Sequence, residues 1–505
     1  RVEVQQFRAA LESVQAYGDP QVIGLRGVAG IGKSRLLEEF ARLAELEGFA
    51  FHVLTSLELG AGGRNQLPAE LALRLLGAEP GESAAALEVR LADASAALRP
   101  GDAALLRGLL QMPQHSEDAR LIDTMQHETR IEAQAGALAA LVARRCATPP
   151  LMLAVEDVHW SGEQEQQLLA ALLSRLAGPV LFVLTARPGE RAMHASLQHA
   201  PAETSALVLE LAPLAESDAR ALAAQIVAAD SADRRVCLER AQGHPLLLEY
   251  LLRDGSHGPA HAGLPRTVQL LAQSRLDQLD EGDRQAARAA AVLGAQFELE
   301  ALRELIARPD YSPEPLLRSF LVRQRGARLA FCHALIHEGI YASLLQAPRA
   351  ALHARCAHWF AGRDAVLRAH HLLCAGHDEA PDAASRAARE LIDRYQFGEA
   401  LVLLDAALAA ATRAPMRFDL LILRATACMK RGDVAASVLA CEEAARSAPD
   451  RRGRCDALIE LALGLNTLER VADAEDALDE AGAIAAQLDL PVQASRVHHL
   501  RGNFH

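Results

Sequence analysis

A segment near the start of the chain has the residue types and the spacing of a phosphate-binding loop. Residues 27–34 read Gly-Val-Ala-Gly-Ile-Gly-Lys-Ser and fit the pattern G-x-x-x-x-G-K-[ST] completely. In such a loop the backbone curls so that successive N–H groups point at phosphate oxygens. We expect Lys33 on the β and γ phosphates of a nucleotide and the Ser34 hydroxyl on Mg²⁺. A glycine-rich turn that binds nothing is the weaker alternative. The glycines expected to cradle the phosphates are Gly27, Gly30 and Gly32.

Two adjacent acidic residues follow an apolar run that reads as a buried strand. The run covers residues 151–155, and Glu156 and Asp157 come directly after it. A magnesium-dependent phosphate site needs carboxylates at the end of a neighbouring strand, both for the metal and for the attacking water. We expect one of the two carboxylates to hold Mg²⁺ through water and the other to orient or deprotonate the water, and the residues do not tell which. The alternative is an acidic pair that caps the next helix.

A guanidinium follows the next apolar run, at residues 180–184. The segment Thr185-Ala186-Arg187-Pro188 brings a hydroxyl and an arginine to the end of that run. In a parallel sheet this end lies at the same edge as the phosphate loop. We therefore expect Arg187 to sense a γ-phosphate, for which the planar guanidinium is suited. The alternative is an ion pair at the surface before a proline turn.

The elements that must position these groups alternate between strands and helices. An apolar run at residues 22–25 precedes the phosphate loop, and a helical pattern with one apolar face follows the loop. Further runs at 151–155, 180–184 and 207–211 also read as buried parallel strands separated by helical sequence. This alternation predicts an α/β domain with a parallel sheet over residues 1–205.

Beyond this domain the chain is mainly helical and rich in alanine and leucine. From about residue 350 a weak self-similarity with a first spacing of 34 residues indicates the paired helices of a tetratricopeptide-like solenoid. We expect residues 349–505 to bind a partner protein or an inducer. An alanine-rich bundle with a chance period is the alternative. The matching positions are Ala400, Leu404 and Ala407, then Val434, Val438 and Cys441, then Ala474, Leu478 and Ala481.

Composition and charge limit the classes of protein. The 505 residues contain 52 Lys and Arg against 65 Asp and Glu, a net charge of −13, which disfavours direct binding of nucleic acid or of an anionic membrane. The sequence has no apolar run of membrane-spanning length and no signal peptide at its start. The eight cysteines form no C-x-x-C pair, as is usual in a reducing compartment. We expect a cytoplasmic protein and, since the chain begins at Arg1, a piece of a longer one.

Several motifs together resemble those of the signal-transduction ATPases with numerous domains, the STAND class. Within that class they are most similar to the AAA-type modules of large LuxR-family regulators and of proteins attached to class III adenylate cyclases or serine/threonine kinases. The sequence departs from the family at Ser161-Gly162, where members usually have Ala-Asp, and at Glu156, where members usually have Asp. The segments that carry the resemblance are 27–37, 157–160 (Asp-Val-His-Trp), 185–190, 243–246 (Gly-His-Pro-Leu), 264–268 and 331–336.

The resemblance implies further domains and further site residues. Residues 206–262 would form a helical lid, with Pro245 packed near adenine, and residues 263–348 would form a winged-helix domain. His333 would contact the β-phosphate of ADP in a closed state, with a core histidine as the alternative. The implied cofactors are ATP or ADP with Mg²⁺.

The function implied by the resemblance is a slow ATPase that acts as a switch. ADP would hold the lid and winged helix closed, exchange for ATP would open them and allow homo-oligomerisation, and hydrolysis would reset the switch. One alternative is a DNA-binding regulator that uses its winged helix, although the arginines of residues 264–348 are scattered among acids. Another is the control region of an adenylate cyclase or protein kinase, although neither an H-R-D nor a D-F-G kinase motif is present in the sequence.

Overall fold

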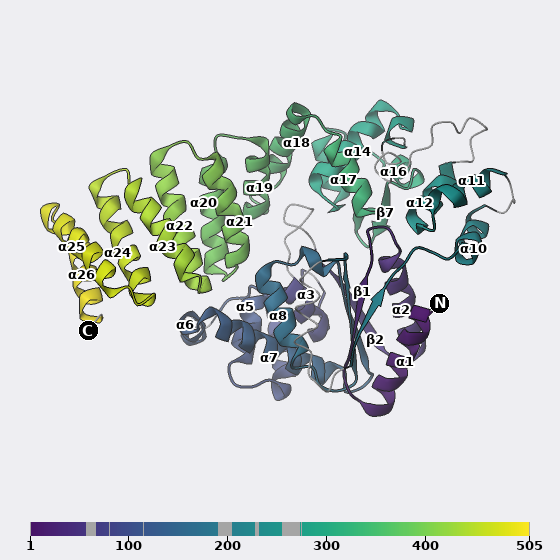
Figure 1. Cartoon of the computed structure of the whole chain (residues 1–505), viewed down its shortest axis with the longest axis horizontal. Coiled ribbons are helices and arrows are strands. Elements are labelled where there is room, and N and C mark those ends of the chain that lie inside the picture. The colour runs from purple at the N-terminus through teal and green to yellow at the C-terminus, as the bar shows by residue number, and fades with distance from the viewer. Residues whose placement is uncertain are drawn as a thin grey trace. The chain divides into compact units, whose positions relative to one another are not determined.

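The structure is a computed structural model that divides into two compact units, shown as one ribbon in Figure 1. The first unit comprises residues 1–123 and 131–345, and the second comprises residues 124–130 and 346–505. Each unit is described by itself. The structure describes residues 2–56, 67–79, 81–114, 116–189, 205–227, 232–254, 273 and 275–503.

The first unit is built around a parallel sheet of five strands in the order β2-β3-β4-β1-β5. All neighbouring strands pair in parallel, which confirms the predicted sheet. Because their carboxyl ends share one edge, the segments that follow β1, β3 and β4 meet there. The strands are β1 (Gln21–Arg26), β2 (Ala50–Thr55), β3 (Leu151–Glu156), β4 (Val180–Ala186) and β5 (Ser205–Glu210).

Helices cover both faces of the sheet, and alternate strand residues point to opposite faces. In β3, Leu153 packs with the helices of one face and Met152 with those of the other. Phe7 stacks on Phe40 within the second of these cores, with ring centroids 3.8 Å apart. One face carries α1 (Val2–Tyr17) and α2 (Lys33–Leu46). The other carries α3 (Leu67–Leu76), α4 (Ala84–Ala94), α5 (Asp102–Leu109), α8 (Glu163–Leu173) and α7 (His127–Arg145) from Ile131 onward, beside α6 (Ser116–Thr124) and the short turns η1 (Ser95–Ala97) and η2 (Val158–Trp160).

Two small groups of elements complete the first unit. The first group is helical and follows β5: α10 (Glu216–Ile226), α11 (Ala232–Ala241) and α12 (Pro245–Asp254). The second group contains a three-stranded antiparallel sheet in the order β6-β8-β7. Residues 264–268, expected to open a winged-helix domain, lie outside the described residues. The second group comprises α14 (Glu281–Leu293), β6 (Gln296–Phe297), α15 (Leu299–Leu305), α16 (Glu314–Arg318), β7 (Val322–Arg325), β8 (Arg328–Phe331) and α17 (Ala334–Ala342).

The second unit is an array of helices in which each helix packs on the next. The repeated positions found in the sequence fall on every second helix, α21, α23 and α25, and Leu404, Val438 and Leu478 are buried there. This confirms a helical repeat. Among the described residues, no helix is both long and apolar enough to cross a membrane. The helices are α18 (Gln346–Trp359), α19 (Ala365–Ala375), α20 (Ala380–Asp393), α21 (Phe397–Ala410), α22 (Ala414–Arg431), α23 (Val434–Arg446), α24 (Arg451–Thr467), α25 (Val471–Gln487) and α26 (Pro491–Asn503).

Candidate functional site

The predicted phosphate loop joins β1 to α2 and takes a shape that requires glycine. Gly30 and Gly32 have φ angles of 81° and 105°, in the left-handed region that favours glycine. A Cβ atom at Gly30 would lie 2.7 Å from Cε1 of His244 and 2.9 Å from Cδ2 of Leu246. The loop therefore leaves no room for a side chain at Gly30, and the left-handed conformations of Gly30 and Gly32 make its backbone curl tightly.

Lys33 is the first residue of α2, and its amine lies over the loop. Its Nζ donates to the carbonyl oxygens of Gly27, at 2.8 Å, and Val28, at 3.3 Å. Burial lowers the pKa of Lys33, whereas the nearby Asp157 carboxylate opposes this effect. Ser34, the next residue, is exposed at the start of the helix. The arrangement leaves a cation and a hydroxyl beside the curled backbone.

The two predicted carboxylates stand at the end of β3. Glu156 is buried, with 9% of its surface exposed, and Asp157 adopts a left-handed backbone conformation with φ 54°. The N–H of Asp157 donates to Oγ1 of Thr185 at 2.9 Å, which ties the end of β3 to β4. Burial raises the pKa of Asp157, and the positive charges of Lys33 and Arg187 oppose the rise. Carboxylate oxygens are among the ligands that Mg²⁺ prefers, so the chemistry of Glu156 and Asp157 fits the metal that the sequence predicts.

Arg187 lies near Lys33 and Asp157 but is paired elsewhere. Its Nη2 donates to Oε1 of Glu338, on α17, at 3.0 Å. Its guanidinium carbon is 5.4 Å from the centroid of the Trp160 ring. The contact with Glu338 is the kind of ion pair that the alternative interpretation of Arg187 expects. The charge of Arg187 still acts on Asp157 and Lys33.

The segment before α12 touches the phosphate loop directly. Pro245 is the first residue of α12, and the contacts with the loop come from its neighbours. Nε2 of His244 lies 3.0 Å from the carbonyl oxygen of Ala29, and Nδ1 of His244 accepts from the N–H of Leu247 at 3.3 Å. Since a carbonyl only accepts, these two bonds place the proton of a neutral His244 on Nε2. Sequence reasoning missed His244, although it stands inside the quoted motif.

His333 is also brought to this edge. It caps α17, with Nδ1 accepting from the N–H of Leu335 at 3.1 Å. Burial lowers the pKa of His333 to about 4, and the positive charges of Lys33 and Arg187 act in the same direction. His333 is therefore neutral at pH 7, and because Nδ1 accepts, its proton is on Nε2.

Besides His244, three residues that sequence reasoning missed contact the predicted site. Nη2 of Arg325, at the end of β7, donates to Oγ1 of Thr55 at 2.9 Å and lies 3.7 Å from Oε2 of Glu156. Thr55 Oγ1 in turn donates to Oε2 of Glu156 at 3.5 Å. The third is Glu338, the partner of Arg187. Arg325 is one of several scattered arginines, and no local pattern marked it.

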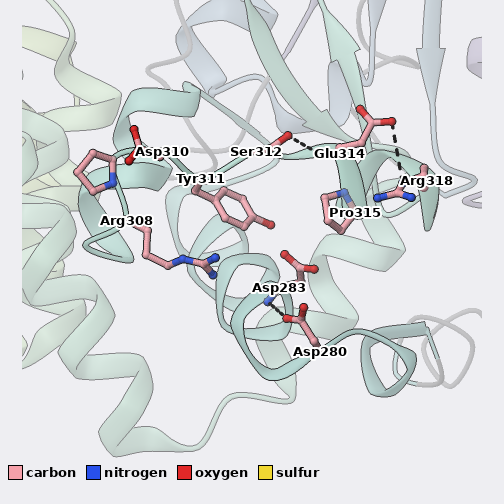
Figure 2. Close-up of a pocket in the computed structure, with 10 residues that line it drawn as sticks. Asp280, Asp283, Arg308, Asp310, Tyr311, Ser312, Glu314, Pro315 and Arg318 are labelled. Carbon is pink, nitrogen blue, oxygen red and sulfur yellow. Dashed lines mark hydrogen bonds and ion pairs between the residues drawn. The ribbon is translucent and has the colours of Figure 1, made fainter.

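A separate hollow of about 620 Å³ is lined by residues between Asp280 and Arg318 (Figure 2). Figure 2 shows Asp280 accepting from the N–H of Asp283, a bond of 2.7 Å that caps α14, and Glu314 facing Arg318. Burial raises the pKa of Tyr311, which also lines it. None of its lining residues belongs to the predicted site, so we do not assign the nucleotide to it.

Comparisons with known proteins agree with this geometry. Residues 1–183 match the family described as AAA ATPase domain. A curated protein of Rhizobium meliloti (strain 1021), itself described as uncharacterized, is 30% identical over 381 residues, which are 67% of this chain and 34% of that protein. The chain thus spans about a third of the length of that relative.

Among solved structures, a STAND protein with a tetratricopeptide repeat sensor from Pyrococcus horikoshii matches with a TM-score of 0.54. The two are 15% identical, and the match covers 98% of this chain and 67% of that one. The Drosophila ORC bound to DNA matches with a TM-score of 0.22 and 13% identity, covering 95% of this chain and 71% of that one. That score is too low to support an argument about this chain.

The fold and the family match define residues 1–183 as an AAA-type P-loop ATPase domain, and such a domain implies a nucleotide cofactor. With its helical repeat, the whole chain has the fold of a STAND ATPase with a tetratricopeptide sensor. The family match therefore confirms the AAA-type domain that the motifs indicated, and the solved structure confirms a STAND-like fold.

Proposed function

We propose that this chain is a nucleotide-dependent regulatory switch that hydrolyses ATP slowly. The observation that carries the proposal is that α17 and β7 reach the phosphate-loop edge of the ATPase sheet. Arg325 contacts Glu156 there, Glu338 pairs with Arg187, and the charge of Lys33 acts on His333. Glu156 and Arg187, two of the predicted catalytic residues, are thus engaged by side chains from residues 320–340. A closed and inactive state requires such contacts.

The residues then divide the work of binding and hydrolysis. The backbone of the phosphate loop and Lys33 bind the β and γ phosphates, and Ser34 with Glu156 or Asp157 holds the metal. When bound, Mg²⁺ neutralises charge that develops on the phosphates. The remaining carboxylate orients or accepts a proton from the attacking water. His333, with its proton on Nε2, donates to a β-phosphate oxygen in the ADP state.

The other domains give the switch its partners. Pro245 and its neighbours link the lid to the adenine side of the nucleotide. The order of elements from α14 to β8, helix, strand, two helices and two strands, supports a winged-helix domain over residues 263–348. The helical repeats bind a protein partner or an inducer. In the ATP state the chain forms homo-oligomers.

The alternative of a DNA-reading winged helix has less support. Arg323, Arg325 and Arg328, the arginines of β7 and β8, each lie within ion-pair distance of an acid, namely Glu38, Glu156 and Glu298 respectively. Arginines engaged in this way are not available to phosphates of DNA in the closed state.

The first test is to denature freshly purified protein and to identify the released nucleotide by chromatography. We expect about one ADP per chain from the wild type and none from Lys33→Ala, because the lysine amine is the principal cation of the loop. A mutant that retains nucleotide and responds to ATP like the wild type would contradict the proposal. An empty wild-type protein that also fails to bind added ATP or ADP would do so too.

A further inference from the structure

We propose that Arg325 is a positioning residue of the ATPase site that holds Glu156 inactive until the β7–β8 hairpin is released. This inference rests on the proposed switch. It adds to the switch the contact that keeps Glu156, at the end of β3, engaged in the closed state. Arg325 lies in a different group of elements from Glu156, so the contact exists only while the two groups are together. Glu156 is then available for metal or water only after Arg325 has left.

The geometry of Glu156 shows why a cation is needed there. Only 11% of the Glu156 side chain is exposed, and a carboxylate so far removed from water requires compensation. Arg325 provides it at 3.7 Å, and Thr55 bridges the two by a bond to each. The guanidinium of Arg325 thus neutralises the charge of the Glu156 carboxylate. A divalent cation bound at this carboxylate would otherwise do so.

The hairpin is built to present this arginine. Arg325 ends β7 and pairs with Arg328 at the start of β8, across a tight turn in which Gly326 has a φ of 59°. Gln324 Nε2 donates to the carbonyl oxygen of Gly326 at 2.8 Å and supports that turn. Arg325 is therefore held at a paired strand end, and we infer that it approaches or leaves Glu156 with the hairpin as a whole.

Two further ion pairs act beside this contact. Arg323 Nη1 lies 3.6 Å from Oε1 of Glu38 on α2, and Arg187 binds Glu338 on α17. These pairs are partly exposed, so each is weak, and a set of weak pairs can be released by a ligand. Only the pair of Arg325 reaches a predicted catalytic carboxylate, which makes it the pair that links closure to chemistry.

The same hairpin offers a matched control. Arg328 is also an arginine at the hairpin turn. It pairs at 3.1 Å with Glu298, the residue that follows β6 of the same small sheet. Arg328→Ala therefore removes an equal charge and a comparable ion pair without touching Glu156. Arg325→Lys keeps the charge but not the planar fork, and Glu156→Gln keeps the shape of the carboxylate but not its charge.

The experiment measures the release of fluorescent ADP from the full chain and the hydrogen exchange of residues 322–331. We expect Arg325→Ala to release ADP about 5-fold faster or more and to speed exchange in the hairpin, within the usual range of coupling between sites. It should also lower the Mg²⁺ concentration for half-maximal ATPase activity. Arg328→Ala should release ADP at the wild-type rate within about 2-fold, and Arg325→Lys should lie between, on the same scale of coupling.

A double mutant separates this contact from general damage to the hairpin. In a Glu156→Gln background, Arg325→Ala should change ADP release little, because its charged partner has already gone. Equal effects of Arg325→Ala and Arg328→Ala, or an undiminished effect in that background, would overturn the inference. Wild-type protein that binds no nucleotide would instead overturn the proposed switch, so the two failures are distinguishable.

Discussion

The phosphate loop depends on close contact at single residues. Gly30 combines a left-handed φ of 81° with direct packing against the segment that starts α12. Gly18, before β1, has a similar φ of 73° but nothing within 4 Å of the Cβ position. The two glycines therefore share the requirement on the backbone, and only Gly30 has the requirement on space.

This pair gives a prediction about the loop. Gly18→Ala should lower the free energy of unfolding by about 1–2 kcal/mol, the usual penalty of a left-handed alanine. Gly30→Ala should lower it by roughly a further 1–3 kcal/mol, because the new methyl group overpacks against His244 and Leu246, and should weaken ADP binding. Urea denaturation and calorimetric titration with ADP test this. Equal losses in both variants would show that the contact with His244 does not constrain the loop.

At the scale of elements, the helical array is held by small residues where helices cross. A Cβ at Gly464, on α24, would lie 2.8 Å from Cγ2 of Val438 on α23. One at Gly482, on α25, would lie at ordinary distances of 3.6 Å from Cγ1 of Val497 and 3.9 Å from Nη2 of Arg501. Valine is stiff at χ1 and cannot move its methyl group away without strain. The crossing of α23 and α24 is therefore closer than a side chain at residue 464 permits.

Alanine at these two helical glycines should act in opposite directions. Gly482→Ala should stabilise the array by about 0.5–1 kcal/mol, because alanine favours the helix and the site has room. Gly464→Ala should destabilise it by about 1–3 kcal/mol through overpacking. Denaturation monitored by the fluorescence of Trp359, in a Trp160→Phe background, reports on this unit. Stabilisation by both variants would mean that the helix crossing adjusts freely.

Sequence patterns predicted the elements that are buried and continuous, and missed those that depend on tertiary contact. β1, β3 and β4 were predicted because their apolar runs are buried on both faces of the sheet. The run at 207–211 also predicted β5, although β5 lies at an edge of the sheet. β2, at the other edge, was not predicted, because His52 interrupts its apolar run. The contact of Arg325 with Glu156 joins residues far apart in the chain, and no local spacing encodes it. The placement of His333 near Lys33 came from the family resemblance alone.

A buried histidine pair joins α18 to α19. Nδ1 of His353 and Nδ1 of His371 lie 2.9 Å apart, so one ring donates and the other accepts. Burial lowers the pKa of His353 to about 4 and that of His371 well below its ordinary value, with His370 and Arg349 adding to the effect on His353. Phe360 stacks on His371 and closes this site. A proton on both rings would leave two donors facing each other.

This pair makes the helical unit sensitive to acid. Between pH 6.5 and about 4 the unfolded chain binds a proton at His353 that the folded chain does not, so stability falls as pH falls through that window. His353→Gln should make the pH dependence shallower by at most about 1.4 kcal/mol per pH unit. His358→Gln, at an exposed position on the same helix, should leave it unchanged. Denaturation followed by Trp359 fluorescence at pH 7, 6, 5 and 4 tests this, and an unchanged slope in His353→Gln would contradict it.

At the scale of the whole molecule, the chain consists of two compact units with different cores. The first holds the ATPase sheet and every residue of the candidate site, and the second holds the helical repeats. Each unit has its own tryptophan, Trp160 in the first and Trp359 in the second. If the two units unfold independently, a ligand stabilises only the unit whose folded state binds it. If they unfold as one cooperative body, the ligand stabilises both. Adding nucleotide therefore distinguishes these two cases.

Thermal unfolding of single-tryptophan variants should therefore show two transitions with different responses to ADP. At about 100 times its Kd, ADP should stabilise the transition reported by Trp160 by about 2.7 kcal/mol and leave that reported by Trp359 in place. Lys33→Ala should abolish the shift, because it removes the cation that binds phosphate. Gly482→Ala should move only the Trp359 transition. If ADP moved both transitions together, the units would unfold as one. Binding of the nucleotide would then change the stability of the repeats as well.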